Sequence, residues 1–273
     1  MFLDTVILVL QEILEAALII SILLSLTGHF RRYWGEDFSL GHGWIGVSLV
    51  LGSLGAWIYA AYTPSITLWF DYVGLEIVNA LIQILIIIFL LFLCYGLSLK
   101  RLRDIAWFNL FVGFCITLVV ALGIIREVSE IIIYCIGILS QPNNYSPVLL
   151  GSFIALGIGA SSGIILYYLL TNFPGFWGLR LSMLLLALYA GNMASQASLL
   201  LIQADWLPYT PELWDSSFLI PEFTVSGQLL YALVGYEANP SILQAGLYSF
   251  AVLIILVSPL FRICWQQKQP ISA

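Results

Sequence analysis

The chain has 273 residues, of which 61% are hydrophobic and only 9% are charged, and its mean hydropathy is +1.02. A soluble domain carries about 25% charged residues, so this composition excludes an ordinary soluble enzyme, a disordered chain and a nucleic-acid-binding protein. The net charge of −6 gives no field that would attract polyanions. We therefore expect a protein embedded in a lipid bilayer, with no nucleic acid among its partners.

Seven apolar runs are long enough to cross the hydrocarbon core, which needs about 20 residues of helix. They are residues 3–27, 42–62, 74–97, 106–139, 148–170, 180–203 and 242–263. Polar residues or Pro and Gly separate the runs, and Thr63-Pro64 is expected to end the second. No cleavable signal peptide is expected, because Met1–Asp4 has no basic residue. The sequence predicts an all-α, polytopic membrane protein with seven transmembrane helices in a single domain, residues 1–273.

The basic residues predict how these helices are oriented. Eight of the nine follow the first, third, fifth or seventh run: Arg31, Arg32, Lys100, Arg101, Arg103, Arg180, Arg262 and Lys268. The loops after the second, fourth and sixth runs contain none. Because Lys and Arg concentrate in cytoplasmic loops, we expect the N-terminus outside and the C-terminus inside a cell membrane, inner or plasma.

Charged residues stand inside two of the runs. The first run contains Gln-Glu-Ile-Leu-Glu at 11–15, and the fourth contains Arg-Glu-Val-Ser-Glu at 126–130. A charged side chain at the bilayer centre costs roughly 2.5–3.5 kcal/mol, so five of them facing lipid would cost on the order of 10–15 kcal/mol. They are therefore expected to face each other or a wet cavity.

The spacing of these residues favours a cation site. Glu12 and Glu15 share one helix face, as do Glu127 and Glu130, and Arg126 is the i,i+4 partner of Glu130. Carboxylates this close repel each other unless they take up protons or a cation. Two converging ExxE pairs offer four oxygen ligands, which hard cations prefer. A trivalent ion with these four carboxylates and the arginine would be electrically neutral, although one proton would reverse that preference.

The two motifs lie 115 residues apart, and each begins a set of three runs. Because three is odd, the second set crosses the membrane upside down relative to the first, as in the inverted repeats of secondary transporters. The expected organisation is a first repeat at 3–97, a second at 106–203, an acidic outer loop at 204–241 and a seventh helix at 242–263.

The third run of each half carries a polar face. Glu76, Asn79 and Gln83 follow an i, i+3, i+7 pattern, and Asn192 and Gln196 follow i, i+4. Such residues serve either as hydrogen-bond partners between helices or as part of a site. Glu76 stands near the outer end of its run and is a candidate carboxylate at the mouth of a path.

The long outer loop is acidic and contains no basic residue. Its acidic residues are Asp205, Glu212, Asp215, Glu222 and Glu237. Such a surface raises the local concentration of cations. Its apolar stretch 218–236 is interrupted by Pro221 and Gly227, so a re-entrant or interfacial segment and an ordinary solvated loop are both open.

The two motifs resemble the R-E-G-L-E signatures of the oxidase-dependent iron permeases, which include the fungal high-affinity iron permease and the bacterial EfeU-type transporters. The resemblance covers essentially the whole chain, through residues 12–25, 74–76, 190–206, 214–216 and 235–241. This sequence differs in having Gln11 where the family has arginine, and Ile13 and Val128 where it has glycine.

The resemblance implies an iron permease in which Glu12, Glu15, Glu127 and Glu130 coordinate the transported iron and Arg126 shapes the site. The supporting residues we expect are Gln11, Arg126, Glu76, Asn79, Asn192, Gln196 and Asp215. Family members generally work beside an extracytoplasmic redox or iron-delivery protein, so such a partner is expected. No resident cofactor is expected.

Two other functions remain open from the sequence. One is transport of another hard or heavy cation, and the other is a non-transporting membrane subunit whose carboxylates are structural. A membrane-embedded enzyme is disfavoured, because the chain has no HExxH motif and Asp4 is the only aspartate in or near the interior of a run. Neither histidine stands beside an ExxE motif, as a carboxylate-bridged oxidase would require.

Overall fold

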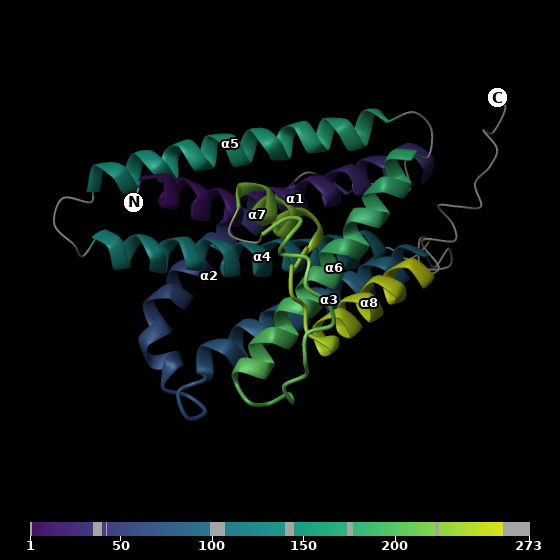
Figure 1. Ribbon diagram of the computed structural model, residues 1–273. Coiled ribbons are helices and arrows are strands. Elements are labelled where there is room, and N and C mark those ends of the chain that lie inside the picture. Colours follow the sequence, from purple (N-terminus) through teal and green to yellow (C-terminus); the bar gives the residue numbers. More distant parts are fainter. Residues whose placement is uncertain are drawn as a thin grey trace.

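The computed structural model describes residues 2–34, 40–41, 43–98, 107–139, 145–173, 177–221 and 224–258. These residues form an all-α bundle (Figure 1). Its helices are α1 (Phe2–Trp34), α2 (Gly43–Thr67), α3 (Gly74–Ser98), α4 (Phe108–Leu139), α5 (Tyr145–Asn172), α6 (Trp177–Gln203), α7 (Val225–Val234) and α8 (Ile242–Val257).

The helices α1 to α6 are long and apolar enough to cross a membrane, which confirms the expected polytopic architecture. The predicted seventh run begins as expected with α8, but residues 259–263 lie outside the described residues, so a seventh span stays a prediction. The predicted outer loop at 204–241 contains the short helix α7, which contacts α1 and α6.

The outward faces of the bundle are apolar. On α5, the side chains of Phe153 and Ile165 are 78% and 68% exposed, and on α2 Trp57 is 66% exposed. In water such surfaces would drive aggregation, whereas in lipid they match the solvent. The interior buries large apolar side chains such as Phe30 and Leu90, together with a smaller set of polar and charged ones.

Helix α1 packs along α5, and α4 packs along α2 (Figure 1). Both pairings depend on glycines that let the helices approach closely. A Cβ added at Gly159 of α5 would clash with Ile13 of α1, and one added at Gly52 of α2 would lie 2.7 Å from Cγ2 of Ile124 in α4. Ile13, which stands where the related family has glycine, thus fits against a glycine of the neighbouring helix.

A second pair of glycines begins the third helix of each predicted half. A Cβ on Gly74, the first residue of α3, would clash with the backbone carbonyl oxygen of Ile66 near the end of α2. A Cβ on Gly178 in the first turn of α6 would clash with the carbonyl oxygen of Leu170 near the end of α5. The two glycines therefore make the same close contact with the end of the preceding helix.

The expected break at Thr63-Pro64 was wrong, because α2 continues through Pro64 to Thr67. Proline removes one backbone donor from a helix, but it stands here in the last turns. The hydroxyls of Thr63 and Thr67 donate to the carbonyls of Tyr59 and Thr63, at 3.0 and 2.8 Å. These hydroxyls bond to carbonyls four residues earlier in the same helix, which is a common arrangement for Ser and Thr in membrane helices.

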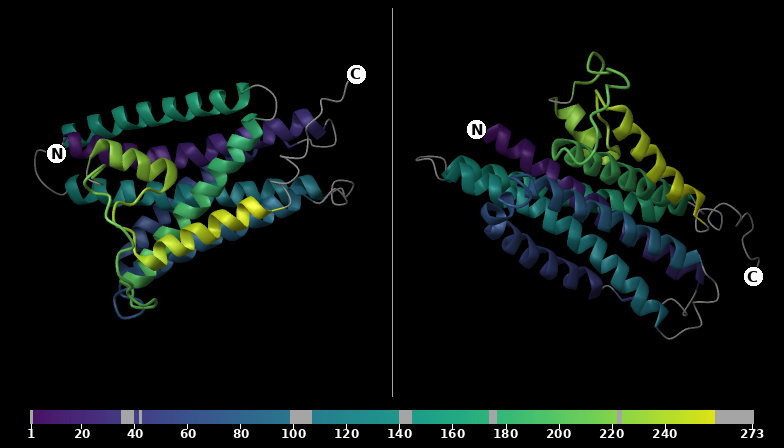
Figure 2. Two further views of the ribbon diagram at one scale, coloured as in Figure 1. Left: turned by 45° about the vertical axis from the view of Figure 1, so that its right-hand side comes forward. Right: turned by 90° about the horizontal axis from the view of Figure 1, so that it is seen from below.

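The basic residues that the structure describes outside the bundle interior gather at one end. Arg32, at the end of α1, donates to the carbonyl of Thr171 at the end of α5 (3.2 Å), and Arg180 lies in the first turn of α6. At the opposite end, the ring of Phe70 between α2 and α3 packs edge-on against Trp206 after α6. Figure 2 shows α7 and α8 on one face of the bundle and α2 on the other.

Candidate cation site between the first and fourth helices

The two predicted motifs meet inside the bundle. Helix α1 supplies Glu12 and Glu15, and α4 supplies Arg126, Glu127 and Glu130. The first four are almost fully buried, with exposed fractions of 6%, 1%, 6% and 1%, whereas the side chain of Glu130 is 42% exposed. The structure therefore brings together all four predicted ligands and the predicted arginine.

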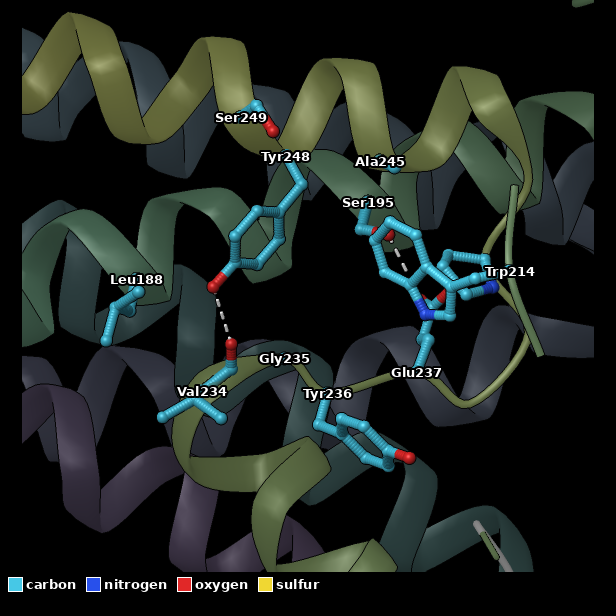
Figure 3. A pocket seen from close by; sticks show the side chains of 11 residues that line it. Leu188, Ser195, Trp214, Val234, Gly235, Tyr236, Glu237, Ala245, Tyr248 and Ser249 are labelled. Atoms are coloured by element: carbon cyan, nitrogen blue, oxygen red, sulfur yellow. Dashed lines mark hydrogen bonds between the residues drawn. The ribbon is translucent and has the colours of Figure 1, made fainter. Parts of the chain in front are cut away.

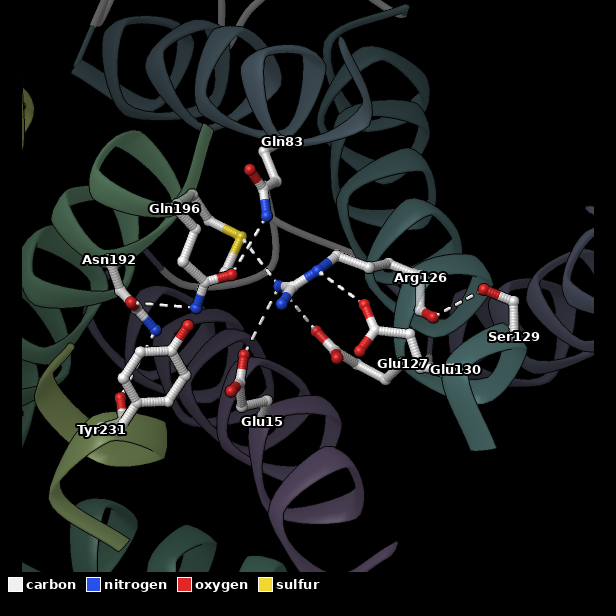
Figure 4. Close-up of polar contacts among 10 residues, drawn as sticks. Glu15, Gln83, Arg126, Glu127, Ser129, Glu130, Asn192, Gln196 and Tyr231 are labelled. Atoms are coloured by element: carbon white, nitrogen blue, oxygen red, sulfur yellow. Dashed lines mark hydrogen bonds and ion pairs between the residues drawn. The ribbon is translucent and has the colours of Figure 1, made fainter. Parts of the chain in front are cut away.

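The guanidinium of Arg126 lies among the carboxylates (Figure 4). Its Nη1 donates to Glu127 Oε1 at 3.0 Å and to Glu15 Oε2 at 3.4 Å. Its Nε lies 3.7 Å from Glu130 Oε1, which confirms the i,i+4 ion pair. The bond to Glu15 crosses from α4 to α1, so one arginine ties the two motifs together.

Two further residues, Ser129 and Met193, contact Arg126. Ser129 donates its hydroxyl to the carbonyl of Arg126 at 2.7 Å, which leaves the Ser129 side chain folded against its own helix. Met193 of α6 places its Sδ 3.7 Å from Arg126 Nη1. Met193 is completely buried, so it closes one side of the cluster.

The cluster contains more acceptors than donors. Glu12 interacts electrostatically with Glu127, Glu130 and Glu15. Among the described residues, three buried oxygens of the ionised carboxylates accept no hydrogen bond: Glu12 Oε2, Glu15 Oε1 and Glu127 Oε2. Glu12 and Glu127 are close enough to share a side-chain hydrogen bond, which requires a proton on one of them. An unsatisfied buried polar atom costs about 1–3 kcal/mol, and more when it is charged. The arrangement therefore calls for protons or a cation on these oxygens.

While the guanidinium of Arg126 lies between them, the carboxylates are not arranged as a set of metal ligands. Among the described residues, no three His, Cys, Asp or Glu side chains form a group that could hold a metal ion. The guanidinium stands between the carboxylates of α1 and α4. Coordination of an ion by both helices would thus require the arginine to move.

A chain of amide side chains runs from α3 through α6 to α7 (Figure 4). Gln83 Nε2 donates to Gln196 Oε1 and Gln196 Nε2 donates to Asn192 Oδ1, both at 3.0 Å. Asn192 Nδ2 in turn donates to the carbonyl of Tyr231 at 3.5 Å. Asn192 and Gln196 therefore serve as interhelical hydrogen-bond partners beside the cluster.

Glu76 and Asn79 lie on α3, and Tyr59 of α2 connects them to the cluster. The hydroxyl of Tyr59 donates to Asn79 Oδ1 at 2.9 Å, and Tyr59 interacts electrostatically with both Glu130 and Glu76. Glu76 Oε2 is buried without a hydrogen-bond partner among the described residues. Glu76 thus lies on the same side of the cluster as the half-exposed Glu130.

Two of the predicted supporting residues are not drawn into the cluster. Gln11 is half-buried on α1 and, within the described part of the chain, makes no hydrogen bond to the carboxylates. Asp215 is exposed and accepts hydrogen bonds from the hydroxyl and the amide of Ser217, at 2.6 and 2.9 Å. These bonds hold the pKa of the Asp215 carboxyl below its ordinary value.

A cavity of about 520 Å³ lies between α6, α8 and the segment after α7 (Figure 3). Glu237 lines it, and its two carboxylate oxygens accept from Ser195 Oγ (3.0 Å) and Gln244 Nε2 (2.8 Å). Across the cavity, Tyr248 donates its hydroxyl to the carbonyl of Val234 at the end of α7 (2.7 Å). Tyr231 interacts with both Glu15 and Glu237, so α7 separates this cavity from the cluster.

Sequence reasoning did not single out three of these neighbours. Met193 follows Asn192 directly, and only its place in the polar part of the sixth run could have indicated it. Tyr231 lies in the interrupted apolar stretch, and Glu237 was counted only among the acidic residues of the outer loop. All three depend on where α7 lies against α6, which local sequence patterns do not reveal.

Together, the apolar bundle and its buried charged cluster define a polytopic membrane protein with ionisable groups in its interior. Comparisons with models of known protein families, with curated proteins and with solved structures find no match for this chain.

Proposed function

We propose that this protein is a permease that moves a hard cation across the cell membrane through the cluster of Glu12, Glu15, Glu127 and Glu130. One observation carries the proposal: three buried carboxylates and the half-exposed Glu130, from two helices of an apolar bundle, gather around one arginine. Intramembrane ionisable groups are costly and mark substrate or ion paths. The resemblance of the two motifs to the iron permeases makes iron the expected cargo.

The alternative, a purely structural ion-pair network, accounts less well for the cluster. A buried structural network needs its lone pairs satisfied to repay the cost of desolvation. Here, among the described residues, three buried carboxylate oxygens accept no hydrogen bond in the ionised cluster, and Arg126 supplies one positive charge for four carboxylates. A site that exchanges cations or protons explains this excess of acceptors, whereas a network of permanently ionised groups that only ties helices together does not.

The packing also supports the inverted-repeat arrangement. If α1, α2 and α3 correspond to α4, α5 and α6, then the α1–α5 contact corresponds to the α4–α2 contact, and both are extensive. Gly74 and Gly178 have the same relation to the preceding helix in the two halves. In transporters of this design the site lies between the halves, near the bilayer midplane.

We place the N-terminus outside and the C-terminus inside, since Arg31, Arg32 and Arg180 gather at one end of the bundle. In that orientation Glu76 and Glu130 lie on the outer side of the cluster and form the entry from outside. The acidic outer segment with Asp205, Glu212 and Asp215 attracts cations toward this entry. It also faces the side on which the iron permeases meet their extracytoplasmic redox or iron-delivery partner.

The test is uptake of labelled iron into proteoliposomes that contain the purified full chain, against protein-free liposomes. Ferrous iron, ferric iron, zinc and manganese are offered separately and then in competition. We expect saturable iron uptake that Mn²⁺, which also prefers oxygen ligands, inhibits by binding the same site, and that zinc inhibits more weakly. Faster uptake of another metal would show a permease for that cation, and no flux of any metal, with or without the products of neighbouring genes, would contradict transport.

A further inference from the structure

The side chain of Arg126 occupies the position between α1 and α4 that a cation bound by both helices would need. Its Nη1 lies 3.0 Å from Glu127 Oε1 and 3.4 Å from Glu15 Oε2. A hard cation binds carboxylate oxygens at roughly 2.0–2.6 Å. A cation held by the same two oxygens would therefore overlap with the guanidinium, and the two positive charges would repel strongly in the dry interior.

We propose that Arg126 is a tethered competitor of the cargo: its positive charge holds the carboxylates of Glu15, Glu127 and Glu130 together while no cation is bound, and the arriving cation displaces it. This inference rests on the proposed function and adds to it how the site is regulated and which ions it accepts. It explains why the four carboxylates converge while, among the described residues, they form no group ready to hold a metal.

Most contacts between the guanidinium and the carboxylates are long, as expected for a group that an arriving cation displaces. Only one of its carboxylate contacts is as short as 3.0 Å, and the others are 3.4 and 3.7 Å, which is long for a charge-assisted hydrogen bond. Figure 4 shows Gln83 on the opposite side of the guanidinium from Glu15. The amide nitrogen of Gln83 faces the guanidinium, and Gln83 Oε1, which has no hydrogen-bond partner among the described residues, would accept from the displaced arginine only after the amide turns over.

The need to displace Arg126 determines which cations the site selects. A monovalent cation replaces one positive charge by another and gains little over a guanidinium held by three carboxylates. A divalent or trivalent hard cation brings more charge and takes up the unsatisfied oxygens of Glu12, Glu15 and Glu127. The arginine thus selects multivalent cations, and its departure breaks the Arg126–Glu15 bond that ties α1 to α4.

The test measures Mn²⁺ binding to the purified full chain in detergent, by titration followed with electron paramagnetic resonance. Mn²⁺ is a hard divalent probe that stays in one oxidation state during the titration. The proteins compared are the wild type, Arg126→Gln, Arg126→Lys and the control Arg32→Gln, whose arginine bonds to a carbonyl at the end of the bundle. A parallel titration contains an excess of K⁺.

We expect Arg126→Gln to bind Mn²⁺ at least about tenfold more tightly than the wild type and to lose discrimination against K⁺. Arg126→Lys keeps the positive charge without the forked contacts of a guanidinium, so its affinity for Mn²⁺ is expected to lie between those of the wild type and Arg126→Gln. This variant keeps the test decisive if Arg126→Gln does not fold. Arg32→Gln should match the wild type. Equal or weaker binding by both Arg126 variants would overturn this inference alone, whereas no Mn²⁺ binding by any protein would overturn the proposed function with it.

Discussion

Glu12→Gln and Glu127→Gln are each expected to reduce cation flux by about 100-fold or more while leaving the protein folded. Glutamine keeps the shape of glutamate but replaces one oxygen ligand with an amide nitrogen that donates hydrogen bonds and does not bind a hard cation. Each change also removes one buried negative charge from a cluster in which Arg126 alone supplies positive charge. Folding should therefore be preserved or improved.

The control for these variants is Glu212→Gln, which makes the same chemical change on the exposed outer segment. At a saturating cation concentration we expect it to keep wild-type flux, because the outer segment raises only the local concentration of cations. Flux is measured in proteoliposomes, and the amount of folded protein is measured by size-exclusion chromatography and thermal unfolding. If Glu12→Gln and Glu127→Gln instead lowered the unfolding temperature and left flux unchanged, the carboxylates would be structural and the subunit hypothesis would be preferred.

Gly74→Ala and Gly178→Ala are expected to destabilise the protein by about 3 kcal/mol each, the upper part of the usual range for single substitutions. The added methyl group would meet a backbone carbonyl oxygen, of Ile66 in one case and Leu170 in the other. Backbone moves less easily than a side chain, so the connection between the second and third helix of each half must open. The two variants should have similar effects, because each glycine lies against a carbonyl oxygen near the end of the preceding helix.

The matched control is Gly46→Ala on α2, where an added Cβ would meet no atom within 4 Å. Thermal unfolding in detergent compares the three variants with the wild type, and Gly46→Ala is expected to be neutral. Wild-type stability in Gly74→Ala or Gly178→Ala would show that these connections are looser than the structure describes. A large loss in only one of them would contradict the equivalence of the two halves.

The sequence predicted the helices and the composition of the cluster because both follow from strong local rules. A run of about 20 apolar residues can only be a spanning helix in lipid, and an i, i+3 spacing places Glu12 with Glu15 on one face. The i,i+4 pair of Arg126 and Glu130 follows from the same helix geometry and is confirmed. The cost of exposing these charges to lipid then brings the two motifs together.

Other features depend on contacts between distant segments. The apolar faces of α1 and α5 show no period that distinguishes lipid from protein, so their pairing through Gly159 could not be predicted. The interrupted stretch at 218–236 left the position of α7 open. The side chain of Arg126 could have stayed within α4 on Glu130, and only the packed structure shows it reaching Glu15 on α1.

The most direct measurement is an experimental structure of the protein with its cation, determined at a cation concentration that saturates uptake. We expect an ion coordinated by carboxylate oxygens of both motifs, from among Glu12, Glu15, Glu127 and Glu130, at about 2.0–2.6 Å. We also expect Arg126 to have moved away from Glu15. A cluster with no ion, in which Arg126 still bonds to Glu15 and Glu127, would contradict the central claim.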